Sequence, residues 1–149
     1  MYTRKVSVSK DPDFLEVVKK LRSADVSFMN FEGQIGHPDA YPIKPYSFAS
    51  YFFGEPWIAK EYAWSGFNLT SLANNHMNDW SHHAIEESIK QLDEAGIVHS
   101  GAGMNLTAAR EPGYLDTSNG RVALISIDSS HEQGAVSYTH LRAHETPAN

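Results

Sequence analysis

Cysteine is absent from the 149 residues of this chain. Disulfide bonds, zinc–thiolate sites and thiol nucleophiles are therefore excluded. Positive charge is also scarce. The chain has 12 Lys and Arg but 18 Asp and Glu, so its formal net charge is −6. An acidic balance argues against a nucleic-acid groove, since phosphate binding relies on clustered basic side chains.

Long hydrophobic runs are missing as well. The longest are a few residues, as in Val122–Ile125, whereas a membrane-spanning helix needs about 18. The first residues contain no apolar segment of the kind found in a signal peptide. The rest of the composition is ordinary for a globular protein, with 41% hydrophobic residues, and the length allows one domain or part of a larger one.

Helical and strand patterns alternate along the chain, which predicts an α/β fold with mainly parallel strands flanked by helices. We expect one helix over residues 11–24, with Asp11 as its N-cap, and another over residues 56–65, ended by Gly66. A third helix is expected around Ile85–Leu92, and a brief one after Asn105. The expected strands are 26–31, 67–72 and 97–100, the first of them buried on both faces.

The remaining segments are a hairpin, a long loop and a tail. Residues 114–127 predict a C-terminal β-hairpin, because Asn119-Gly120 between two β-type runs is typical of a tight turn. Residues 33–54 predict a long loop of the kind that is functional or mobile. Residues 131–149 show no sustained periodicity and resemble translated adapter sequence. We therefore expect a partial domain over residues 1–130, followed by an unstructured, non-native tail.

Polar residues follow two of the expected strands. Glu32 comes after the first, and Asn75-His76 with Asp79 comes after the second. The carboxyl ends of neighbouring parallel strands meet at one edge of a sheet, so these side chains are expected to face one crevice. A carboxylate, a carboxamide and an imidazole suit a hard divalent cation, which would polarise a phosphoryl oxygen or activate a bound water. His76 would be a metal ligand or a proton donor, with Asp79 fixing its tautomer.

Each of these residues also has a structural interpretation. A Glu-Gly pair after a strand is typical of a solvated turn, and Asn-Asn-His before a helix serves as turn and cap. His82-His83 is expected on a solvated helix face, and His99 as a packed, hydrogen-bonded histidine. The aromatic residues 46–53 are expected to pack from the loop against the core rather than to form a stacking platform, since no basic residue beyond Lys44 lies among them.

Together, these segments resemble the CapA family of poly-γ-glutamate capsule biosynthesis proteins, which have a metallophosphatase-like (calcineurin-like) fold. The resemblance runs from about Ala24 to Ile127. Its most specific part is the pairing of Asn30-Phe31-Glu32-Gly33 with Leu72-Ala73-Asn74-Asn75-His76 and the following Asp79. Further support comes from Ala24-Asp25-Val26, Lys44-Pro45-Tyr46-Ser47-Phe48, Leu92-Asp93-Glu94-Ala95-Gly96-Ile97 and Gly101-Ala102-Gly103-Met104-Asn105-Leu106, together with Ala108-Ala109-Arg110 and Val122-Ala123.

The resemblance implies a layered α/β sandwich that holds a divalent metal ion (Mn, Mg, Fe or Zn) at its strand ends. The family's opening Gly-Asp strand and its later His-rich segments are not present in these residues, so we expect an internal fragment that is inactive by itself. The implied roles are metal binding by Glu32 and Asn75, catalysis by His76 and Asp79, and substrate binding by Asn30, Asn74 and Lys44.

Two functions are implied for the intact protein. The first is a divalent-metal-dependent, phosphoesterase-like hydrolase in the biosynthesis of a capsule or envelope polymer. The alternative is a non-catalytic module for polymer assembly or export that binds an anionic polymer such as poly-γ-glutamate. The expected partners are an anionic polymer or a phosphoester and other capsule-synthesis proteins, with no nucleic acid. The resemblance points to the cell envelope, while the residues themselves leave the localisation open.

Overall fold

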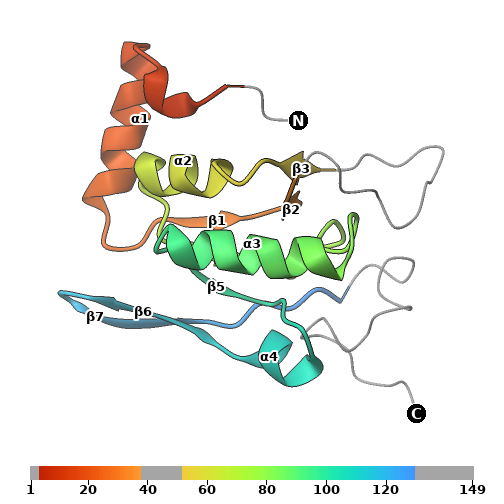
Figure 1. The fold of residues 1–149 in the computed structure, drawn as a ribbon. Coiled ribbons are helices and arrows are strands. Elements are labelled where there is room, and N and C mark those ends of the chain that lie inside the picture. Colours follow the sequence, from red (N-terminus) through yellow and green to blue (C-terminus); the bar gives the residue numbers. More distant parts are fainter. Residues whose placement is uncertain (1–3, 38–51, 130–149) are drawn as a thin grey trace.

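The computed structural model describes residues 4–37 and 52–129, and Figure 1 shows the order of the elements. Lys44, the middle of the long loop and the tail from residue 131 lie outside the described residues, so the predictions made for them stay predictions. The elements are η1 (Val6–Val8), α1 (Pro12–Ser23), β1 (Phe28–Asn30), β2 (Gln34–Ile35), β3 (Phe53–Gly54), α2 (Ile58–Ser65), β4 (Leu69–Ser71), α3 (His82–Glu94), β5 (Val98–Ser100), α4 (Leu106–Arg110), β6 (Gly113–Thr117) and β7 (Gly120–Leu124).

The main sheet confirms the prediction of an α/β fold with parallel strands. Its order is β1-β4-β5, and both pairs of neighbours are parallel. The last two strands, β6 and β7, form the predicted antiparallel hairpin, which extends beside β5 in Figure 1. Helices flank the parallel strands, and none in the described part of the chain is both long and apolar enough to cross a membrane.

The helix ends follow the sequence signals closely. The carboxylate of Asp11 accepts hydrogen bonds from the backbone N–H groups of Asp13 and Phe14, at 2.9 and 3.2 Å. Gly66 ends α2 in the left-handed conformation, with φ of 106°, where a side chain would be strained. Asn105 caps α4 by accepting from Ala108 N at 2.9 Å. These ends were predictable because each depends on contacts within one turn.

The first strand differs from its prediction in length and burial. It covers Phe28–Asn30 rather than residues 26–31, and its burial pattern is exposed, intermediate, exposed. Phe28 is 51% exposed, so the expectation of a strand buried on both faces is wrong. Among the described residues β1 pairs with β4 alone, and its outer edge therefore lacks the cover that an inner strand of the sheet receives.

The two ends of the long loop pair with each other, which the sequence did not predict. Gln34–Ile35 and Phe53–Gly54 form the parallel strands β2 and β3. Gln34 is fully buried; its Nε2 donates to Ser81 O at 3.0 Å, and its Oε1 accepts from Trp80 N at 2.6 Å. This side chain therefore joins the loop to the start of α3. Strands of two residues are too short to leave a periodic pattern in a sequence.

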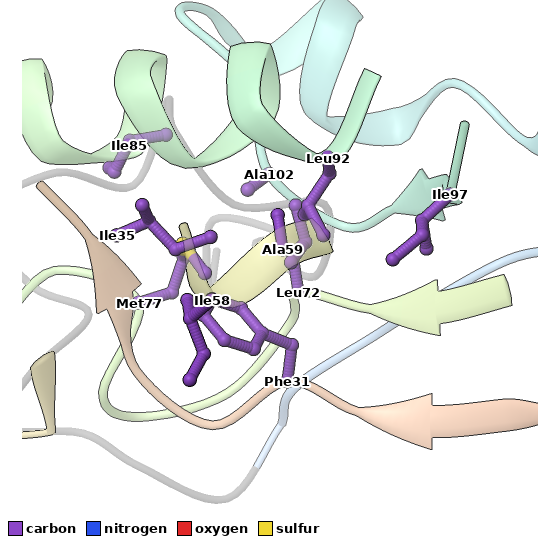
Figure 2. Packing of buried hydrophobic residues seen from close by; sticks show 10 residues of the cluster. All are labelled: Phe31, Ile35, Ile58, Ala59, Leu72, Met77, Ile85, Leu92, Ile97 and Ala102. Carbon is purple, nitrogen blue, oxygen red and sulfur yellow. The ribbon is translucent and has the colours of Figure 1, made fainter. Parts of the chain in front are cut away.

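The hydrophobic core lies where the strand-end loops meet α2 and α3 (Figure 2). Phe31, Leu72 and Ala102 each lie just beyond the carboxyl end of a strand of the main sheet, and each belongs to this core. Their burial anchors the loops that follow the strands, so these loops start from fixed positions. The other residues of the cluster are Ile35, Ile58, Ala59, Met77, Ile85, Leu92 and Ile97.

Candidate functional site

Two loops begin side by side at the carboxyl end of the main sheet. The backbone ladder continues past the strands, because Phe31 N donates to Ser71 O at 3.0 Å and Leu72 N donates to Ser100 O at 2.9 Å. Glu32 lies two residues past the end of β1, and His76 lies in the turn after β4. The two segments therefore meet at the carboxyl end of the sheet, whereas the shared crevice stays a prediction.

His76 lies between two carboxylates. Its Nδ1 is 2.6 Å from Oδ2 of Asp79, and its Nε2 is 3.7 Å from Oε1 of Glu32. The first distance is that of a short, charge-assisted hydrogen bond, whereas the second is too long for a hydrogen bond and is an electrostatic contact. The side chains of His76 and Asp79 are 14% and 15% exposed, and that of Glu32 is 48% exposed.

A tight turn brings His76 and Asp79 together. Met77 N donates to Asn74 O and Asp79 N donates to His76 O, each at 3.3 Å. Residues three apart in such a turn lie on the same side of the chain, which allows the two side chains to bond. Met77, on the opposite side, is 2% exposed and belongs to the hydrophobic core. The turn is thus anchored in the core by Met77, while the mostly buried His76 side chain lies between Asp79 and Glu32.

Asn74 joins this turn to the end of β1. Its Nδ2 donates to Phe31 O at 2.8 Å, and its Oδ1 accepts from His76 N at 3.1 Å. The residue is 8% exposed. Both polar atoms of the side chain are therefore engaged inside the protein, one on each of the two loops that carry Glu32 and His76.

Phe52 packs against the His76 ring and was missed as a site residue. The two ring centroids are 4.6 Å apart and the ring planes are inclined by 74°, which is an edge-on arrangement. As one of the aromatic residues 46–53, it was expected only to pack from the loop against the core. No signal within the sequence could have paired residues 52 and 76, because the contact depends on the pairing of β2 with β3.

The remaining predicted residues lie at different places. Asn30 is exposed at the end of β1, and Asn75 is half-buried in the turn before His76. Of the pair His82-His83, expected on a solvated helix face, His83 is exposed, with a side chain that is 96% exposed, whereas His82 is half-buried, so the prediction is wrong for His82. His99 is hydrogen-bonded, also as expected, with its Nε2 3.1 Å from Oδ1 of Asp93.

Comparison with known proteins identifies the family of this chain. The chain matches the family described as bacterial capsule synthesis protein PGA_cap over residues 2–148. It belongs to this family. The match covers nearly the whole chain and agrees with the CapA resemblance inferred from the two strand-end segments.

Curated proteins are also similar in sequence to this chain, and one of them is named as a CapA protein. The uncharacterized proteins y4sH and y4uA of Sinorhizobium fredii (strain NBRC 101917 / NGR234) are each 36% identical over 131 residues, which is 86% of this chain and 28% of each protein. The capsule biosynthesis protein CapA of Bacillus anthracis is 32% identical over 72 residues, which is 48% of this chain and 18% of that protein. The chain thus spans about 28% of the length of the first two relatives.

The described part of this PGA_cap chain does not by itself make up a metal site. Among residues 4–37 and 52–129, no three His, Asp or Glu side chains are grouped so that they could hold a metal ion. Nδ1 of His76 is bonded to Asp79, which leaves Nε2 of His76 and the carboxylate of Glu32 as neighbouring donors. These two donors alone are fewer than the three or four protein ligands usual for a catalytic metal, and the carboxamide of Asn75 is a further predicted one. Metal binding by Glu32 and Asn75 stays a prediction.

Proposed function

We propose that the capsule synthesis protein containing this chain is a hydrolase of the phosphoesterase type, in which His76 transfers the proton. The observation that supports this most directly is the position of the His76 imidazole, bonded at Nδ1 by Asp79 and facing Glu32 with Nε2. A carboxylate on Nδ1 fixes the tautomer and orientation of the ring, which is what a general acid or base requires. Glu32 places a second, half-exposed carboxylate near the other ring nitrogen.

The chemistry follows from the two ring nitrogens. When the ring carries both protons, Nδ1 donates to Asp79 and Nε2 can donate to the leaving-group oxygen as the phosphorus–oxygen bond breaks. The water that attacks the phosphorus gives up a proton, and this proton restores the imidazolium. Asp79 keeps Nε2 directed outward during both transfers, since its bond to Nδ1 prevents rotation of the ring. Phe52 restricts the ring further by packing against it.

The test is turnover of a generic aryl phosphoester by the full-length protein, supplied with divalent cations. His76→Ala should lower kcat by about 10²- to 10⁴-fold, the usual contribution of a positioned proton donor. Asp79→Asn should lower it by at least about tenfold, because the ring is no longer held in one tautomer. His99→Ala is the matched control, since His99 also bonds an aspartate, Asp93, and should keep the activity of the parent protein.

The proposal fails if His76→Ala and the parent protein hydrolyse the phosphoester equally. Absence of turnover with every divalent cation, together with cation-independent binding of poly-γ-glutamate, would instead support the assembly or export role. The charge of the chain does not favour that role, because a net charge of −6 repels a polyanion.

For the intact protein we also propose a bound divalent cation, to which this chain would contribute Glu32 and Asn75 as ligands. No step above depends on it, because the described residues do not complete a ligand set. The test is thermal unfolding of the full-length protein with and without Mn²⁺: a ligand that binds only the native state raises the unfolding temperature. Glu32→Gln should reduce that increase. An equal increase in the parent protein and in this variant would remove Glu32 from the metal site.

A further inference from the structure

Asn74 is hydrogen-bonded to the main chain on both sides of the 3.7 Å gap between Oε1 of Glu32 and Nε2 of His76. One end of its amide binds the carbonyl of Phe31, the residue immediately before Glu32, and the other end binds the backbone N–H of His76 itself. A single side chain is thus bonded to the main chain on both sides of the gap. With 8% exposure of the residue, competition from water is limited, most of all for the fully buried bond to Phe31 O.

The same two strands carry a second bridge of this kind at their other end. Asn68, just before β4, accepts from Ser27 N at 2.8 Å and donates to Asp25 O at 2.9 Å. It therefore joins the amino ends of β1 and β4, as Asn74 joins the loops at their carboxyl ends. The two asparagines provide similar cross-links, but only Asn74 touches the loops that carry the proposed chemistry.

We propose that Asn74 is a positioning residue that sets the separation of Glu32 and His76. This inference rests on the proposed function of His76 and gives Asn74 a role that differs from the substrate contact predicted from the family resemblance. The role requires one donor and one acceptor on the same short side chain, and a carboxamide supplies both. Aspartate keeps the acceptor for His76 N–H but has no donor for Phe31 O, and alanine keeps neither.

These differences define the experiment, which uses the full-length protein with Asn74→Asp, Asn74→Ala and the control Asn68→Ala. With a generic aryl phosphoester, both Asn74 variants should lose about 10²-fold in kcat with little change in KM, which is the effect of displacing a catalytic group by about 1 Å. Asn68→Ala should keep kcat. Equal losses of kcat in Asn68→Ala and Asn74→Ala would overturn the proposal, because the effect would then reflect general destabilisation.

A second measurement does not depend on turnover. Hydrogen exchange at the backbone N–H of His76 should speed up in Asn74→Ala and stay slow in Asn74→Asp, which retains the acceptor. With ¹⁵N-labelled histidine, the Nδ1 proton signal of His76 should broaden in both Asn74 variants and stay sharp in Asn68→Ala. Unchanged exchange and an unchanged ring signal in Asn74→Ala would overturn the positioning role. If these signals change while the parent protein shows no turnover, the positioning stands and the hydrolase proposal fails.

Discussion

The Phe52 ring lies edge-on to the imidazole of His76, with 4.6 Å between the ring centroids. The backbone of Phe52 is held in turn, because its carbonyl accepts from Gln34 N at 3.2 Å. The start of β3 therefore connects to the proposed acid–base residue through one aromatic contact. Movement at this end of the long loop would reach His76 directly.

We predict that Phe52→Ala lowers the phosphoesterase activity proposed above by about two- to tenfold, since aromatic pairs of this kind contribute about 0.5–1.5 kcal/mol. The loss should appear in kcat, because the ring restrains His76 and not the substrate. Phe28→Ala is the matched control: Phe28 is 51% exposed and Phe52 is 45% exposed, but Phe28 lies on β1, in the sheet itself. Equal activities of the two variants would show that the contact has no functional role.

Gly33→Ala should destabilise the protein more than Gly120→Ala. Both glycines have φ near 140°, at 140° and 141°, a conformation that costs other residues about 1–3 kcal/mol. At Gly33 an added Cβ would also lie 2.8 Å from Phe52 Cβ, whereas at Gly120 it would meet nothing within 4 Å. The measurement is the denaturant midpoint of the full-length protein. A larger shift for Gly120→Ala would contradict the predicted close approach of residue 33 to β3.

Ser88→Ala should lower the free energy of unfolding by about 1–3 kcal/mol, because it leaves a buried donor without an acceptor. The hydroxyl of Ser88 accepts from Ile35 N at 2.7 Å, and the serine is fully buried. Ser126→Ala is the control: Ser126 is 4% exposed, and its hydroxyl has no hydrogen-bond partner within the described part of the chain. Equal effects on the denaturant midpoint would show that the Ile35 bond contributes little.

The stability of the β6–β7 hairpin should depend on pH through the ion pair between Asp116 and Arg121. Hydrogen bonds from Arg121 at 2.6 and 2.9 Å lower the pKa of Asp116 below its ordinary value of 3.8, and the guanidinium charge acts in the same direction. A lowered pKa means that the contribution to stability is present above pH 3.8 and is lost as the pH falls through the folded-state value. In Arg121→Gln, the pKa of the Asp116 carboxyl, measured by NMR titration, should rise toward 3.8. An unchanged titration would contradict the pairing.

Local signals in the sequence predicted much of the fold. Asp11, Gly66 and Asn105 were placed correctly at helix ends because a cap acts within one turn and needs no distant partner. The order of helices and parallel strands followed from alternating patterns in the same way. The burial of β1 was predicted wrongly, because burial depends on what lies beside a strand and an apolar sequence does not record it.

The residue types at the two strand ends are evident in the amino-acid sequence, and its alternating α/β pattern predicts that these ends meet. Tertiary structure alone decided which atoms face one another: Nδ1 of His76 on Asp79, Nε2 toward Glu32, Asn74 across both loops, and Phe52 on the imidazole. The difference arises because some interactions join neighbours in the chain and others join residues that are far apart in it. Caps and turns are set by neighbours in the chain, whereas the contacts from residue 76 to residues 32 and 52 exist only once the strands have paired and the core has closed beneath them.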